Sequence, residues 1–302
     1  MSLASELAAA IESEGRPVRV VFANSIQSGN GTPYGSSKER AGAILNAAVE
    51  RVGGQFVNVF LPNIFGEHGR PKYNSFIATF VHTTVHGDTA NINHGRVGLL
   101  HAQDAAQALL DGLTTRRQSL VPAPEEHAVQ EVWDLLQEFH TTYVPTGEIP
   151  DLSTKFRVDL FNTYRAALFP EHYPIALLPQ ADSRGAFVET VRCRGGESQT
   201  AFSTTVPGVT RGEHYHLRKV ERFAVMSGCG TIQLRKMFSD EVLNFEVSGD
   251  DPAAVDMPIG WVHNITNTGD VVMLTQFWSH ELFRRDAPDT FAAPVRVEEQ
   301  PS

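Results

Sequence analysis

Residues 208–228 read GVTRGEHYHLRKVERFAVMSG, and this stretch decides how the second half of the chain is interpreted. His214 and His216 stand one residue apart, so on a β-strand both side chains face the same side. Glu221 opens the next strand-like run, in which alternate residues share one side. The pattern therefore predicts two imidazoles and a carboxylate on neighbouring strands.

Residues 258–267 read PIGWVHNITN and supply a further histidine, His263, directly after a Pro/Gly turn. The two stretches together predict that three imidazoles and one carboxylate meet in one pocket. This donor set suits zinc, manganese, iron or nickel, and we expect zinc. A histidine pair alone occurs on many solvated strands, so the prediction depends on the whole set.

Both stretches resemble the two signature motifs of the cupin superfamily. The matching residues are Gly208, His214, His216, Glu221 and Gly228 in the first motif, and Pro258, Gly260, His263 and Asn267 in the second. The second motif lacks its usual glycine a few residues before Pro258, a position that concerns a turn and not a ligand. The resemblance implies a β-barrel with a metal at its mouth.

The composition is that of a soluble globular protein with room for two domains. The chain has 302 residues, of which 41% are hydrophobic and 20% charged. We expect no membrane insertion and no signal peptide, because no apolar run approaches the necessary length. Two cysteines, Cys193 and Cys229, make no disulfide framework and fit the cytoplasm. The net charge of −10 argues against nucleic-acid binding.

The pattern of elements changes once along the chain, near residue 170. Residues up to about 170 alternate helix-like and strand-like segments, which predicts a parallel α/β sheet. From about residue 185 short strands between Gly, Pro and Asp turns take over, and we expect the junction between Phe169 and Pro179. We predict helices over residues 4–11, 33–52 (capped by Thr32), 73–86, 102–114 and 129–140, and strands over residues 18–23, 56–61 and 97–100.

The first domain carries a second group of candidate residues. Ser25 ends the first predicted strand, and Tyr34 and Lys38 stand four apart on the next helix. Their helix face continues through Ala41 and Leu45, so we expect it to point inward. An ammonium group beside a phenol favours the phenolate, which makes the tyrosine apt for acid catalysis, with Ser25 holding a substrate oxygen. The spacing also arises by chance in many helices.

Three stretches of sequence support a catalytic role for Ser25, Tyr34 and Lys38: VVFANSIQSGNGTPYGSSKERAG, FLPNIFGEHGRPKYNS and LLHAQDAAQALL. They resemble the extended short-chain dehydrogenase/reductase family. The resemblance implies that Ser25, Tyr34 and Lys38 are the catalytic trio, and that hydride passes to or from NADP(H). It also implies a cofactor-binding set of Tyr34, Lys38, Pro62, Asn63 and Ile64.

The sequence departs from that family at its beginning. No unit of strand, glycine-rich turn and helix precedes Val18, and the cluster from Gly29 to Gly31 lies inside the active-site loop. We therefore predict an N-terminally incomplete Rossmann-like domain over residues 1–170, followed by the cupin barrel over residues 171–302. Weak NADP(H) affinity and doubtful reductase activity are expected as a consequence.

The order of a reductase domain and a cupin resembles the CapF/WbjC type of bifunctional UDP-sugar epimerase/reductase. That resemblance implies that the cupin epimerises C3 of a UDP-4-keto-6-deoxy-N-acetylhexosamine and that the reductase domain reduces C4 with NADPH. The product lies on the route to UDP-N-acetyl-L-fucosamine for capsule or O-antigen. The resemblance also implies a homodimer.

Several alternatives stay open at this point. Lys219, Tyr215 and Glu213 are candidate bases for removing the C3 proton, and we give preference to Lys219. A metal held by four protein ligands is also typical of a purely structural site. The whole chain is otherwise interpreted as a metal-dependent cupin dioxygenase or sugar isomerase, or as a non-catalytic protein that binds a UDP-sugar.

Overall fold

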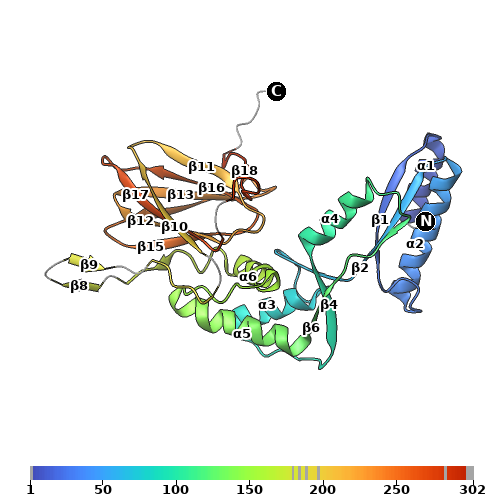
Figure 1. Cartoon of the computed structure of the whole chain (residues 1–302), viewed down its shortest axis with the longest axis horizontal. Helices are drawn as coiled ribbons and strands as arrows, with labels where there is room; N and C mark the ends of the chain where they lie inside the picture. Colours follow the sequence, from blue (N-terminus) through green and yellow to red (C-terminus); the bar gives the residue numbers. More distant parts are fainter. Residues whose placement is uncertain are drawn as a thin grey trace. The chain divides into compact units, whose positions relative to one another are not determined.

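The chain folds into two compact units (Figure 1). The computed structural model describes residues 3–178, 180–182, 185–187, 190–195, 198–281 and 284–296. The first unit reaches to Thr79 and resumes over Asn91–Val132, and the second unit comprises Phe80–Ala90 and the chain from Trp133 onward. In the described part of the chain no helix is long and apolar enough to cross a membrane.

The first unit is an α/β domain, as predicted. Strands β1, β2 and β5 form a parallel sheet; in a second sheet β3 pairs parallel and β6 antiparallel with β4. The elements are α1 (Leu3–Glu14), β1 (Arg19–Ser25), α2 (Pro33–Arg51), β2 (Gln55–Leu61), β3 (Asn63–Phe65), β4 (Arg96–His101), α4 (Ala102–Gly112), β5 (Ser119–Leu120) and β6 (Glu125–Ala128).

Helix α2 begins where the sequence predicts. The Thr32 hydroxyl accepts a hydrogen bond from the Gly35 N–H at 3.0 Å, and Pro33 occupies the first helical position, where its missing N–H costs nothing. The helix crosses from β1 to the parallel strand β2, so both strands end at the same edge of the sheet. Ser25 consequently lies opposite Leu61.

Helices α3 (Phe76–His86) and α5 (Val129–Thr146) each pass from one unit to the other, and both differ in length from the predicted segments. Helix α3 begins three residues later than expected, because the Ser75 hydroxyl caps it by accepting from the Ala78 N–H. Helix α5 continues to Thr146. Helix α6 (Lys155–Leu168) was not predicted; Thr154 caps it, and it is buried on nearly every side.

The second unit contains two five-stranded sheets, most of whose strands Figure 1 shows in yellow to red. Their orders are β10-β17-β12-β15-β7 and β14-β13-β16-β11-β18. The strands are β7 (Ile175–Ala176), β10 (Gln199–Thr205), β11 (Thr210–Tyr215), β12 (Glu221–Ser227), β13 (Cys229–Lys236), β14 (Val242–Ser248), β15 (Ala253–Met257), β16 (Trp261–Asn267), β17 (Met273–Ser279) and β18 (Phe291–Ala292), with a separate hairpin of β8 (Gln180–Asp182) and β9 (Gly185–Phe187).

The predicted change from α/β to β structure is therefore found, and closure of the sheets into a cupin barrel remains a prediction. Buried apolar side chains of both sheets form the core, among them Phe223, Val255, Ile232 and Ile265. Both cysteines are free and exposed.

Candidate metal centre

The structure brings the four predicted metal donors together. His214 lies on β11, His216 directly follows that strand, Glu221 opens β12 and His263 lies on β16. One ligand atom from each residue lies within 4.8 Å of every other. Strands β11 and β16 belong to one sheet and β12 to the other, so the carboxylate and the imidazoles come from different sheets.

A bulge in β11 turns His214 toward His263. The register of β11 against β16 shifts between Gly212 and His214, which leaves His214 directly opposite His263. Gly212 has φ of 108° and Glu213 has φ of 61°. A Cβ atom on Gly212 would lie 2.9 Å from the Asn264 Cα atom and from the His263 carbonyl oxygen. Only glycine therefore fits where the backbone approaches the neighbouring strand this closely.

We expect Gly212→Ala to weaken metal binding and to destabilise the second unit by about 1–3 kcal/mol, because the new methyl group displaces the strand that carries His263. Urea unfolding and zinc titration measure the two effects. Gly208→Ala is the matched control: Gly208 also has positive φ, at 76°, but a Cβ there meets nothing within 4 Å. Equal zinc affinities in the two variants would contradict the prediction.

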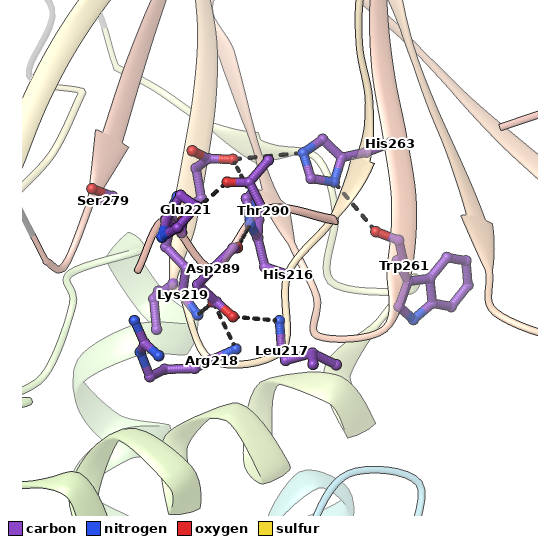
Figure 2. Close-up of polar contacts among 12 residues, drawn as sticks. His216, Leu217, Arg218, Lys219, Glu221, Trp261, His263, Ser279, Asp289 and Thr290 are labelled. Atoms are coloured by element: carbon purple, nitrogen blue, oxygen red, sulfur yellow. Dashed lines mark hydrogen bonds and ion pairs between the residues drawn. The ribbon is translucent and has the colours of Figure 1, made fainter. Parts of the chain in front are cut away.

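Backbone carbonyls fix the tautomers of two imidazoles (Figure 2). The Nδ1 atom of His216 lies 2.6 Å from the Asp289 carbonyl oxygen, and the Nδ1 atom of His263 lies 3.3 Å from that of Trp261. A carbonyl only accepts, so each Nδ1 carries the proton and each neutral ring presents the lone pair of Nε2. Both lone pairs face the Glu221 carboxylate, at 3.0 Å and 3.6 Å.

This arrangement fits a cation. The Nε2 atom of His263 is fully buried and has no hydrogen-bond partner among the residues that the structure describes. Two lone pairs and a carboxylate oxygen repel one another unless a proton or a metal ion lies between them. Two donors of a tetrahedral zinc ion, each about 2.1 Å from it, would lie about 3.4 Å apart, which is close to the observed 3.0 Å and 3.6 Å.

The charge states also favour a metal ion. Burial, together with His263 and His216, lowers the pKa of His214 to about 4, and burial lowers the pKa of His263. Burial raises the pKa of Glu221, but the neighbouring His216 and His263 rings outweigh it and hold that pKa well below its usual range. The centre therefore presents the His214 and His263 imidazoles in the neutral form and an ionised Glu221 carboxylate near neutral pH, as metal ligation requires.

The predicted reductase residues gather at the carboxyl edge of the first unit. Ser25 pairs with Leu61, after which Pro62 links β2 to β3, the strand that contains Asn63 and Ile64. Asn63 donates to the Gly98 carbonyl at 3.3 Å, and Lys38 donates to the Ala23 carbonyl at 2.9 Å. Ser25 and Asn63 thus lie at the carboxyl ends of β1 and β2, the edge at which open α/β sheets bind their ligands.

Comparison with known proteins decides the family. Residues 11–122 match the NAD dependent epimerase/dehydratase family, and residues 180–291 match the polysaccharide biosynthesis C-terminal domain. UDP-2-acetamido-2,6-beta-L-arabino-hexul-4-ose reductase from Pseudomonas aeruginosa is 31% identical over 297 residues, which cover 96% of this chain and 79% of that protein. The chain belongs to the nucleotide-sugar epimerase/reductase family of that enzyme.

Solved structures agree with this family. The capsular polysaccharide assembling protein CapF from Staphylococcus aureus is 30% identical, with a TM-score of 0.60 over 98% of this chain and 83% of that one. The same protein in space group C2221 is 28% identical, with a TM-score of 0.50 over 98% and 90% of the two chains. The chain is therefore an enzyme of sugar-nucleotide modification.

The prediction that the Tyr34 face of α2 points inward is wrong. Tyr34 does not point inward, because its side chain is 51% exposed. The buried residue of the first turn of α2 is Gly35, and the inward face begins to be fully buried only at Gly42 and Leu45. Tyr34 therefore lies at the surface of the edge where Ser25 is found.

The structure separates the three candidate bases. The Glu213 carboxylate accepts from the Asn264 amide at 2.7 Å and from the Val295 N–H at 2.6 Å, which gives it a structural role. Tyr215 stacks on Phe291 and, because strand residues alternate, faces away from His214. Lys219 is buried, between His216 and Glu221 in the chain, and remains the candidate.

Sequence reasoning missed two residues that hold the centre in place, Asp289 and His280. The Nδ1 atom of His280 accepts from the Val220 N–H at 2.9 Å. Asp289 stands 73 positions after His216, and neither contact has a local signal.

We expect His280 to make the second unit sensitive to acid. Burial lowers its pKa to about 4, with Arg165 and Arg218 lowering it and Glu281 raising it. The unfolded chain binds the proton near pH 6.5, so stability is full above that value and declines as pH falls toward 4. His280→Asn retains an acceptor for Val220 but cannot titrate. The melting temperature, measured by thermal unfolding between pH 7 and pH 4, should fall less steeply with pH for this variant than for the wild type. Equal slopes for the two proteins would contradict the role of His280.

Proposed function

We propose that the second unit epimerises C3 of a UDP-4-keto-6-deoxy-N-acetylhexosamine. The observation that carries the proposal is the buried, unpartnered Nε2 atom of His263 facing Glu221. The Pseudomonas relative supports the substrate class, because it is named for a UDP-hexul-4-ose, which has its ketone at C4. We also infer that residues 171–302 form a cupin barrel, since the donors come from two facing strand systems.

The residues suit removal of a proton beside a ketone. A zinc ion held by the three imidazoles and Glu221 would polarise the C4 carbonyl of the sugar as a Lewis acid. Lys219 then takes the C3 proton while the electron pair of the C3–H bond moves toward the C4 oxygen. A solvent-derived proton then adds to the opposite face of C3 as the electron pair returns from the C4 oxygen, which completes the inversion, and Lys219 loses the first proton to solvent once the product has left. Burial of Lys219 keeps water from competing for that position.

Solvent exchange tests the epimerase. Zinc-loaded protein in D2O should incorporate deuterium at C3 of the UDP-4-keto sugar, as measured by NMR or mass spectrometry. Lys219→Met should slow the exchange by about 100-fold or more while zinc binding is retained. Absence of exchange in the wild type would refute the proposal. Sugar binding without turnover would indicate the non-catalytic alternative, and oxygen consumption with bound iron would indicate a dioxygenase.

We further propose that the first domain is of the reductase type and acts at C4 with NADP(H), on the route to UDP-N-acetyl-L-fucosamine. The family match over residues 11–122 supports it, and the gap before the second match at residue 180 is consistent with a boundary near 170. Ser25, Tyr34 and Lys38 would act on the substrate, with Pro62, Asn63 and Ile64 beside the nicotinamide. We propose that the protein works as a homodimer.

The fit for the cofactor is partial. A hydroxyl, a phenol and an ammonium group are present at the carboxyl edge, but the N-terminus of α2, the helix that follows β1, is capped by its own Thr32. We therefore derive no reductase step. NADPH oxidation with a 4-keto substrate tests the activity, with Tyr34→Phe as the control variant, and NADPH fluorescence tests binding alone.

A further inference from the structure

The loop that joins β11 to β12 determines the spacing of two metal donors. This donor loop, residues 217–220, starts after His216 and ends before Glu221. Its carbonyls are held from helix α6: the Asn162 amide donates to the Arg218 carbonyl at 2.9 Å, and the Arg165 guanidinium donates to the Lys219 carbonyl at 3.2 Å. The loop is thus fixed on one side by a buried helix.

Asp289 holds the N–H groups of the same loop (Figure 2). Its carboxylate accepts three backbone hydrogen bonds, from Leu217 at 3.3 Å, Arg218 at 3.0 Å and Lys219 at 2.8 Å. The Asp289 backbone carbonyl accepts from His216 Nδ1 at 2.6 Å. One residue therefore contacts both the loop and a metal donor.

The position of Asp289 is itself constrained. Its φ of 45° lies in the left-handed region, which aspartate and asparagine tolerate better than most residues. The residues after it run along β11, where Phe291 and Ala292 form β18 and pair with Tyr215 and His214. The Ala293 N–H also donates to the Glu213 carbonyl at 3.0 Å. Asp289 is consequently anchored to the strand that carries His214.

We propose that Asp289 is a positioning residue of the metal centre. Its carbonyl keeps the proton of His216 on Nδ1 and leaves Nε2 for the ion, while its carboxylate holds the donor loop at the length that brings Glu221 beside His216. Without the carboxylate, three backbone N–H groups lose their acceptor, and the loop must move to find others. The inference depends on the proposed metal binding and adds a determinant of metal affinity.

The test is zinc affinity, measured by competition with a chromophoric chelator. Asp289→Ala should weaken binding by about 10–100-fold, as loss of a hydrogen-bond partner behind a ligand does at other zinc sites. Asp289→Asn should lose less, because it keeps one acceptor oxygen and the left-handed backbone. Asp286→Ala is the control: Asp286 lies three positions earlier, is exposed and pairs only with Arg284 among the contacts of the described chain, so unchanged affinity is expected.

Cobalt substitution separates positioning from general stability. The visible absorption of bound cobalt reports ligand geometry, and we expect Asp289→Ala and Asp289→Asn to change it. A variant that only lowers the unfolding midpoint of the metal-free protein, with unaltered zinc affinity and cobalt spectrum, would overturn the inference. Failure of the wild type to bind zinc would instead refute the proposed function. Should Asp289→Ala fail to fold, Asp289→Asn carries the same comparison.

Discussion

Replacement of His263 with alanine is expected to abolish stoichiometric zinc binding. The side chain is fully buried, and within the described part of the chain no group hydrogen-bonds to its Nε2 atom. The three donors that remain would leave the ion with an extra open position, and we expect the dissociation constant to rise by at least about 100-fold. Isothermal titration of the metal-free protein measures the change.

The control for this variant is His86→Ala. His86 is an exposed histidine of the second unit, on α3, so its loss removes an imidazole without disturbing the centre. Unchanged zinc affinity in His86→Ala and loss of binding in His263→Ala together assign the ion to the predicted donors. If His263→Ala binds zinc as tightly as the wild type, the assignment of the site is wrong.

Replacement of Asp256 with alanine is expected to destabilise the second unit by about 3–5 kcal/mol. Asp256 is fully buried and accepts two hydrogen bonds from the Arg222 guanidinium, at 2.7 Å and 3.2 Å, and a further one from the Tyr143 hydroxyl. Its removal leaves the arginine charge buried without a counter-ion. Urea unfolding followed by fluorescence measures the loss, with the exposed Asp250→Ala as control.

The buried pair also has a defined pH dependence. Burial raises the pKa of Asp256, but the Arg222 charge and its hydrogen bond outweigh burial and leave that pKa below the ordinary value of 3.8. The pair therefore stabilises the fold above pH 3.8 and loses this contribution as pH falls through the lowered pKa of the folded state.

A double variant, Arg222→Met with Asp256→Leu, should recover most of the stability lost in Asp256→Ala. Recovery of less than about half would contradict this account.

Local patterns predicted much of the first unit. The Thr32-Pro33 pair marked the start of α2 because capping and the absence of a proline N–H are properties of adjacent residues. Helix α6 escaped prediction because its faces are buried on all sides, which removes the apolar stripe that a surface helix displays. The exposure of Tyr34 was missed for a related reason: the periodicity of a helix does not tell where the sheet beneath it ends.

The metal donors could be named from the sequence, but their supports could not. His214 and His216 share a side because of strand alternation, whereas the shift at Gly212 that sets His214 against His263 depends on the register between two strands. Asp289 contacts a loop some 70 positions earlier. Such contacts are made only once the sheets have assembled, and no short pattern encodes them.

Because Glu221 belongs to one sheet and the histidines to the other, an ion at this centre would join the two sheets as a cross-link. Amide hydrogen exchange should then slow in β12 and in β16 together when zinc is added, by up to about 100-fold at a zinc concentration 100 times the dissociation constant. The ion proposed to polarise the sugar carbonyl would therefore also hold the two sheets together, so that removal of zinc would loosen the second unit.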